Sequence, residues 1–149
     1  MTYSSAMFKD PEDNLHKGQI NKYDNLANIT GVKENDKILE IGCGWGGFSS
    51  FLAKKYSANV TAITISKKQY EKAKQKIYDD KLTDKVDVKL LDYRNINGKY
   101  DKIVSIEMFE AVGEKYWSKY FDVLKKNLKS DGSIGPVSYT HLRAHETSL

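Results

Sequence analysis

Four glycines, at positions 42, 44, 46 and 47, follow directly on the apolar segment Lys37–Ile41. Glycine adopts backbone dihedrals that other residues avoid, and it lets a ligand approach the main chain closely. The amides of such a turn, with the amino end of a following helix, form a polar cradle. The pattern therefore predicts a ligand-binding turn between a strand at 37–41 and a helix at 48–56, with an ordinary tight turn as the alternative.

Two kinds of nucleotide ligand fit this turn. Gly42, Gly44 and Gly47 satisfy the G-x-G-x-x-G pattern of dinucleotide sites. Such sites usually place an acidic residue ~20 positions later, at the end of the second strand, to hold the ribose. The segment 64–66 has no acid there, although the following lysines, 67 and 68, could suit a 2′-phosphate. An NADP site therefore stays open on this position alone.

Two carboxylates favour a methyl donor instead. Glu40 precedes Gly42 and completes an E-x-G-x-G sequence that resembles the form typical of methyltransferases. Asp92 ends the third predicted strand, where that fold commonly reads the amine of adenine. Either acid alone could be a charge that solubilises the end of a strand. Their combination with the glycine turn favours S-adenosylmethionine (SAM).

Strands and helices alternate around these residues. Helices are predicted at 11–29, 48–56, 66–78 and 116–128, and strands at 37–41, 59–65, 86–91 and 100–106. Ser66 and Gln69 form a capping-box pattern. Asp131-Gly132 predicts a turn before a fifth strand that begins at Ser133. This alternation predicts an α/β, Rossmann-like fold, a mostly parallel sheet with helices on both faces, whose ligands bind at the carboxyl ends of the strands.

The bulk composition is that of one ordinary globular domain. The chain has 149 residues, 40% of them hydrophobic, and its net charge of +4 comes from scattered lysines. We therefore expect no nucleic-acid binding. The single cysteine, Cys43, cannot form an internal disulfide. Met1 to Phe8 lacks the pattern of a signal peptide, and no apolar run approaches the ~20 residues that span a bilayer, so we expect a cytoplasmic protein.

The last residues do not fit the rest. The segment 137–149 resembles the translation of a sequencing-library adapter, so we exclude it from fold reasoning as a non-native tail. His141 and His145 lie in it, and we therefore predict no metal site. The expected organisation is a donor-covering segment and helix at 1–30, then a SAM-binding core at 31–136. That core is expected to be truncated in its fifth strand, and hence incomplete at the carboxyl end.

Four stretches together carry a family resemblance. They are Tyr3–Phe8 (YSSAMF), Glu40–Gly47 (EIGCGWGG), Thr64–Gln69 (TISKKQ) and Ile103–Gly113 (IVSIEMFEAVG). With them the chain resembles the cyclopropane-fatty-acyl-phospholipid synthases, including the mycolic acid cyclopropane synthases, which are class I SAM-dependent methyltransferases. The resemblance covers residues 2–135.

The resemblance implies a role for each matching position toward the donor. Tyr3 and Ser4 should close over it. Its amino-acid part should lie on the glycine turn, at Gly42, Cys43, Gly44 and Gly46. Thr64 and Gln69 should serve the ribose, and Asp92 and Tyr93 should flank the adenine.

The fourth stretch implies the chemistry. Glu110 matches a glutamate that helps to bind bicarbonate in ring-forming relatives, and it is the predicted catalytic residue. Ala111 stands where those relatives have histidine, and Ser5 stands where some have cysteine. Ring closure and simple methylation therefore both stay open. Glu107 is a competing carboxylate that could instead contact the donor.

The implied reaction is methyl transfer to the cis double bond of an unsaturated (phospho)lipid acyl chain, giving a cyclopropane or methyl-branched chain. The implied partner is an unsaturated acyl phospholipid, with peripheral contact at the inner membrane face. One alternative is a small-molecule N- or C-methyltransferase, because plant alkaloid N-methyltransferases look similar. Another is a SAM-binding fragment that is catalytically incomplete. The identity of the acceptor and the oligomeric state stay open.

Overall fold

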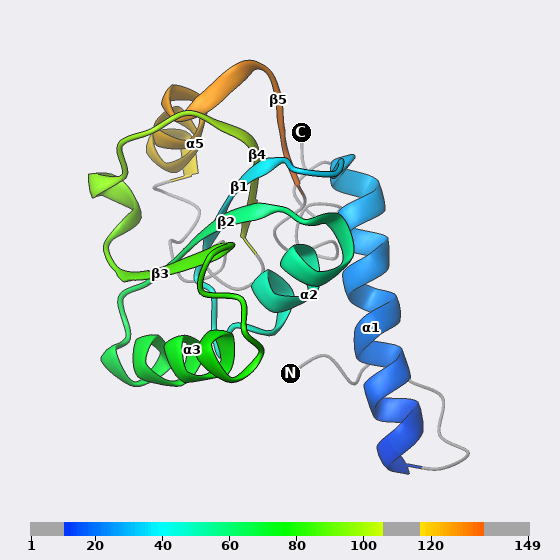
Figure 1. The fold of residues 1–149 in the computed structure, drawn as a ribbon. Helices are drawn as coiled ribbons and strands as arrows, with labels where there is room; N and C mark the ends of the chain where they lie inside the picture. The colour runs from blue at the N-terminus through cyan, green and yellow to red at the C-terminus, as the bar shows by residue number, and fades with distance from the viewer. Residues whose placement is uncertain (1–10, 106–116, 136–149) are drawn as a thin grey trace.

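A computed structural model describes residues 11–105 and 117–135 (Figure 1). The helices are α1 (Pro11–Thr30), α2 (Gly47–Tyr56), α3 (Lys67–Asp79) and α5 (Trp117–Lys126), and a short 3₁₀ helix, η2, spans Tyr93–Asn95. The strands are β1 (Lys37–Ile41), β2 (Asn59–Thr64), β3 (Val86–Leu90), β4 (Tyr100–Ser105) and β5 (Leu128–Ile134). The predicted alternation of strands and helices is confirmed.

The five strands form one parallel sheet in the order β3-β2-β1-β4-β5. The chain moves outward from β1 to β3 and then returns to the other side of β1 with β4. Strand order therefore reverses beside β1, and in such sheets ligands bind at the carboxyl ends of the strands at this point. The predicted Rossmann-like fold is confirmed in the described part of the chain.

Each face of the sheet has its own apolar core. Ile38 of β1 packs with residues of α1, α2 and α3, whereas Leu39 and Ile41 pack on the opposite face with Tyr120 and Leu124 of α5. This division follows from the alternation of side chains along a strand. Figure 1 shows α1, α2 and α3 on one side of the sheet and α5 on the other. Helices on both faces are what a parallel sheet requires.

Local signals place the ends of α1 and α3. Helix α1 begins at Pro11, a residue favoured in a first helical turn. It ends at Thr30, and the next residue, Gly31, closes the last turn with its φ of 77° and with bonds from its N–H to the carbonyls of Ala27 and Asn28. Helix α3 begins after Ser66, whose side chain accepts a hydrogen bond from the backbone N–H of Gln69.

The structure corrects the prediction around the fifth strand. Helix α5 ends at Lys126, and β5 begins at Leu128, five residues before the predicted start at Ser133. Tyr100 pairs with Leu128 and Lys102 with Ser133, so β5 carries three extra residues in a bulge. Asp131 and Gly132 lie in that bulge, where the prediction placed a turn. Asp131-Gly132 has the composition of a turn. The residues before and after it pair with β4, however, so the strand continues through it.

Candidate functional site

The glycine turn joins β1 to α2 through an unusual backbone path. Gly42, Gly44 and Gly46 have φ values of 73°, 54° and 89°, in the left-handed region that residues other than glycine rarely adopt. The N–H groups of Gly42 and Cys43 donate to the carbonyl of Ile63 at 2.9 and 3.0 Å. These bonds attach the turn to the end of β2. The sequence forms this turn because three of its residues carry no Cβ.

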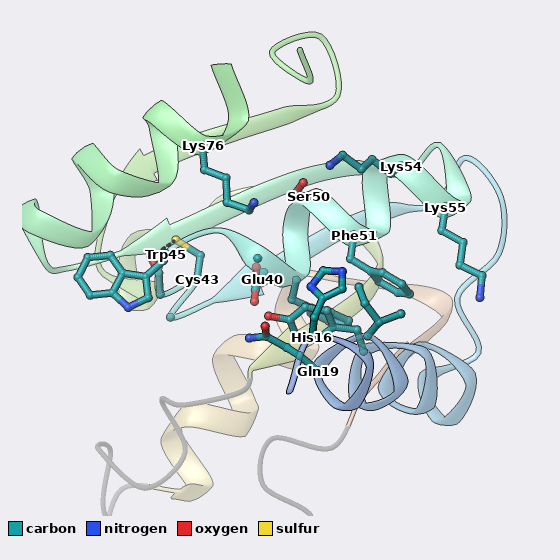
Figure 2. A pocket seen from close by; sticks show the side chains of 16 residues that line it. His16, Gln19, Glu40, Cys43, Trp45, Ser50, Phe51, Lys54, Lys55 and Lys76 are labelled. Atoms are coloured by element: carbon teal, nitrogen blue, oxygen red, sulfur yellow. Dashed lines mark hydrogen bonds between the residues drawn. The ribbon is translucent and has the colours of Figure 1, made fainter. Parts of the chain in front are cut away.

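A cavity of about 570 Å³ lies beside the turn. The turn contributes Gly42, Cys43, Gly44 and Trp45 to its lining, and α1 and α2, the latter from Gly47 onward, contribute most of the rest. Figure 2 shows the lining side chains, with Glu40 between the turn and α1. The cavity therefore combines exposed main chain with one acidic side chain from β1.

Glu40 is almost fully buried, with 1% of its surface exposed. The hydroxyl of Ser49 on α2, itself fully buried, donates a hydrogen bond to its Oε1 atom. The two residues lie on either side of the glycine turn. A buried carboxylate needs hydrogen-bond donors, so this bond holds α2 against the end of β1 and supports the shape of the turn.

Aromatic side chains attach α1 to the same wall. The ring of Tyr23 lies 5.2 Å from that of Phe48 and 5.6 Å from that of Phe51. All three line the cavity. Such tilted contacts between rings add to the free energy of apolar burial. Helix α1 is therefore a fixed part of the cavity wall.

The lysines at the rim of the cavity are paired with acids. Lys54 and Lys76 lie 3.4 and 3.3 Å from Asp80, whose Oδ2 atom also accepts a bond of 2.7 Å from Ser50. The Ser50 hydrogen bond is the main reason that the pKa of Asp80 lies below its usual value. Lys55 pairs with Asp24, which raises the pKa of this lysine. The rim is thus close to charge-balanced.

The two positions that the resemblance assigns to the ribose contact each other. Thr64 ends β2 and is buried, and its hydroxyl donates to Oε1 of Gln69 at 3.0 Å while accepting from the backbone N–H of Ser66 at 3.1 Å. The predicted capping box is therefore half right. Ser66 caps α3, but Thr64 takes the N–H that the Gln69 side chain would bind in a reciprocal box.

The two adenine positions follow β3. The N–H of Leu91 donates to the carbonyl of Thr64 at 2.9 Å, which places this segment beside the end of β2. Both carboxylate oxygens of Asp92 bind Arg94, at distances of 2.7–3.0 Å. The Arg94 side chain is the main cause that holds the pKa of Asp92 below its usual value. The rings of Tyr93 and Tyr120 make a T-shaped contact, with their centroids 4.9 Å apart.

Tyr120 lies behind Tyr93, at the interface between α5 and the sheet. Its side chain is fully buried, and burial raises the pKa of its hydroxyl to about 12, with the hydroxyl of Ser105 acting in the opposite direction. Ser105 is the last residue of β4 and pairs with Ile41 of β1. The phenol therefore stays neutral at physiological pH and acts as a rigid support for Tyr93.

The structure thus brings part of the predicted site together. Gly42, Cys43 and Gly44 line the cavity, and Gly46 caps the helix that starts behind them. Along the same edge of the sheet, but outside the lining of the cavity, lie the ribose and adenine positions Thr64, Gln69, Asp92 and Tyr93. Tyr3, Ser4 and Glu110 lie outside the described residues, as does the segment 137–149. Their roles stay predictions.

Three further residues were missed from the sequence. Arg94 binds the predicted adenine reader, Ser49 binds the acid of the turn motif, and Tyr23 packs on α2 beside the turn. Arg94 could have been found from the sequence, because it places a positive charge two residues after Asp92. Ser49 and Tyr23 offered no such signal, because their partners are set by how the helices pack on the sheet.

Within residues 11–105 and 117–135, no group of three or more histidine, cysteine, aspartate or glutamate side chains is arranged to hold a metal ion. None of the helices within 11–105 and 117–135 is both long and apolar enough to cross a membrane.

The parallel sheet of order β3-β2-β1-β4-β5, with a glycine turn after its central strand, defines a class I methyltransferase fold. A model of the mycolic acid cyclopropane synthetase family matches residues 1–148. The chain belongs to this family.

Relatives from other organisms agree with this assignment. The chain is 39% identical to a probable fatty acid methyltransferase of Pseudomonas putida, over 90% of this chain and 34% of that protein. It is also 39% identical to the cyclopropane-fatty-acyl-phospholipid synthase of Escherichia coli K12, over 89% of this chain and 33% of that protein. The chain thus spans about a third of the length of these relatives.

Solved structures show the same fold. Mycolic acid cyclopropane synthase CmaA1, in a complex with SAH and CTAB, matches with a TM-score of 0.78 at 30% identity, over 89% of this chain and 47% of that one. Coclaurine N-methyltransferase, bound to N-methylheliamine and SAH, matches with a TM-score of 0.75 at 28% identity, over 88% of this chain and 39% of that one.

Proposed function

We propose that the full-length protein containing this chain transfers the methyl group of SAM to the cis double bond of an unsaturated (phospho)lipid acyl chain. The product is a cyclopropane or methyl-branched chain. The observation that carries this proposal is the glycine turn at the end of β1, with Gly42, Gly44 and Gly46 at positive φ, in a chain of this family. The names of the fatty-acid-modifying relatives support the acceptor.

The residues at the sheet edge fit the donor. A turn without Cβ atoms lets the amino-acid part of the ligand lie against the main chain of Gly42, Cys43, Gly44 and Gly46. Thr64 and Gln69, already joined by a hydrogen bond, offer polar atoms to the ribose, and Asp92 with Tyr93 offers a carboxylate and an aromatic ring to the adenine. When bound, SAM supplies a methyl group activated by a positively charged sulfur. The complexes of CmaA1 and coclaurine N-methyltransferase with SAH support this donor.

We assign the acceptor side to residues beyond those described. Tyr3 and Ser4 would close over the donor and exclude water from the reacting carbons. Glu110 would bind bicarbonate and hold a weak base near the added methyl group. The family resemblance of the stretch 103–113 supports this assignment. Ala111, in place of histidine, keeps methyl-branched and cyclopropane products as alternatives.

The acceptor implies where the protein works. A phospholipid acyl chain lies in a membrane, so we propose a cytoplasmic protein that contacts the inner membrane face peripherally. The presence of a detergent, CTAB, in the CmaA1 complex supports a long-chain acceptor. We propose no nucleic-acid partner, because the lysines are scattered and those at the rim of the cavity are paired with acids.

The test uses the full-length protein with methyl-labelled SAM and vesicles of an unsaturated phospholipid. Mass spectrometry of the released acyl chains should show labelled chains heavier by one methylene equivalent, and derivatisation of double bonds separates cyclopropane from methyl-branched, still unsaturated products. Unmodified chains, with donor binding intact, would exclude the lipid acceptor. Affinity for a pyridine dinucleotide and none for SAM would exclude the donor.

A second candidate is a small-molecule N-methyltransferase, which the likeness to coclaurine N-methyltransferase favours. The same assay with a panel of amines in place of vesicles separates the two functions. A third possibility concerns the chain alone, which spans about a third of its relatives. If it is catalytically incomplete, the isolated chain should bind the donor without turnover.

A further inference from the structure

Arg94 binds Asp92 through three separate donors. The backbone N–H and the Nε–H of Arg94 donate to Oδ1 at 2.9 and 3.0 Å, and the Nη2 group donates to Oδ2 at 2.7 Å. Asp92 is the N-cap of the 3₁₀ helix that follows β3, and Arg94 is the second residue of that helix. A two-pronged contact between guanidinium and carboxylate fixes the orientation of both groups as well as their distance.

The pairing with Arg94 leaves one acceptor position of the Asp92 carboxylate available. A carboxylate offers about four acceptor positions, two on each oxygen. Within the described residues, Arg94 takes both positions on Oδ1 and one on Oδ2. One position, on Oδ2, remains for a ligand. The Asp92 side chain is 28% exposed, so this position is within reach of a small molecule.

The Asp92–Arg94 pair contributes little to the stability of the fold. The Arg94 side chain is 66% exposed, and exposed ion pairs contribute about 0–1 kcal/mol to stability. Lys89 and Asp87 form a matched pair with the same two-residue spacing, at 3.6 Å and with both side chains more than half exposed. The Lys89 pair lies within β3, whereas the Arg94 pair lies just past the carboxyl end of that strand, at the ligand-binding edge.

We propose that Arg94 is a positioning residue, which fixes Asp92 so that its remaining Oδ2 position accepts the exocyclic amine of the donor's nucleobase. This inference rests on the proposed function. An ionised carboxylate accepts hydrogen bonds only. It therefore binds a 6-aminopurine and repels a 6-oxopurine, whose corresponding group is also an acceptor. Arg94 sets how strongly the site makes this distinction.

The test measures binding of two products by calorimetry, with the full-length protein. S-adenosylhomocysteine carries the 6-amino group, and S-inosylhomocysteine carries a 6-oxo group in its place. The wild type should prefer the adenosyl compound by about tenfold or more. Arg94→Gln should weaken adenosyl binding about tenfold and inosyl binding by less than about threefold, because only the amine bond depends on the orientation of Asp92.

Three further variants separate positioning from other effects. Arg94→Lys keeps the charge but lacks the fork, and its preference should lie between those of the wild type and Arg94→Gln. Lys89→Gln removes the matched pair and should bind both compounds as the wild type does. Asp92→Asn can donate to a 6-oxo group, so its preference should shift toward the inosyl compound even if Arg94→Gln fails to fold.

The binding results separate a failure of the Arg94 role from a failure of the proposed function. An Arg94→Gln protein that keeps the wild-type preference would overturn the positioning role, and so would one that loses both ligands equally, since that is a general electrostatic effect. An unchanged preference in Asp92→Asn would overturn the reading of the amine by Asp92. A wild type that binds neither compound would overturn the donor assignment itself, and this inference with it.

Discussion

The hydroxyl of Tyr23 lies 2.6 Å from the position that a Cβ atom would take at Gly47. Gly47 is the first residue of α2, and its φ is not positive. Glycine is therefore favoured there by the approach of α1 and not by the backbone of the turn. This contact makes α1 and the glycine turn parts of one packed unit.

The first prediction follows from this contact. Gly47→Ala should lower the free energy of unfolding by about 1–3 kcal/mol, because the added methyl group displaces the Tyr23 hydroxyl. Alanine otherwise favours a helix more than glycine does. Urea unfolding measures the loss, with Tyr23→Phe as the reference. The double variant should be more stable than Gly47→Ala alone, and a double variant that is no better would show that the clash lies elsewhere.

A second prediction concerns the acid of the turn motif. Ser49→Ala removes one donor from the buried carboxylate of Glu40, and it should destabilise the protein by about 1–3 kcal/mol. The matched control is Ser118→Ala on the exposed face of α5, which should change the free energy of unfolding by less than about 0.5 kcal/mol. Equal effects of the two substitutions in urea unfolding would show that the Glu40–Ser49 bond does not support the turn.

The third prediction separates binding from stability at the end of β2. Thr64→Val keeps the shape of the side chain but removes the hydroxyl that joins Gln69 to the N–H of Ser66. Affinity for S-adenosylhomocysteine should fall about tenfold, the effect of one poorly placed hydrogen bond. Thr61→Val, the same substitution three residues earlier on the strand, should bind as the wild type does. Unchanged affinity in Thr64→Val would remove this pair from the donor site.

A fourth prediction is the pH dependence of stability at Asp80, which joins α2 to α3. The folded pKa of this residue lies below its ordinary value of 3.8, chiefly because of the Ser50 hydrogen bond. A group whose pKa is depressed by folding stabilises the protein above its unfolded pKa, and this contribution is lost as the pH falls through the folded pKa. The contribution of Asp80 should therefore be constant above about pH 5, shrink progressively at lower pH, and disappear only below the folded pKa.

Urea unfolding of the wild type and Asp80→Asn between pH 6 and pH 3 measures this contribution as a difference. The difference should be about 1 kcal/mol near neutral pH, because the group is partly exposed to solvent, and it should shrink in acid. The exposed Asp84, replaced by asparagine, provides the control, with a difference near zero throughout. A difference that grows as the pH falls would contradict the assigned direction of the pKa shift.

The elements of the fold were largely predictable because their signals are local. Pro11 and Gly31 mark the ends of α1, Ser66 marks the start of α3, and the apolar segment 37–41 marks the central strand. The η2 helix was missed because a single turn of three residues has no periodicity to detect. The start of β5 was misplaced because Asp131-Gly132 is a turn signal that pairing with β4 overrides.

The sequence by itself determined the chemical types present and the turn that presents them. Glycines at 42, 44 and 46 permit the left-handed dihedrals, and Glu40, Thr64 and Asp92 follow from strand ends that the apolar pattern marks. Tertiary structure alone decided the partners: Ser49 for Glu40, Tyr23 against Gly47, and Asp80 between α2 and α3. These contacts join helices that are separated along the chain, and only their packing on the sheet brings the side chains within bonding distance.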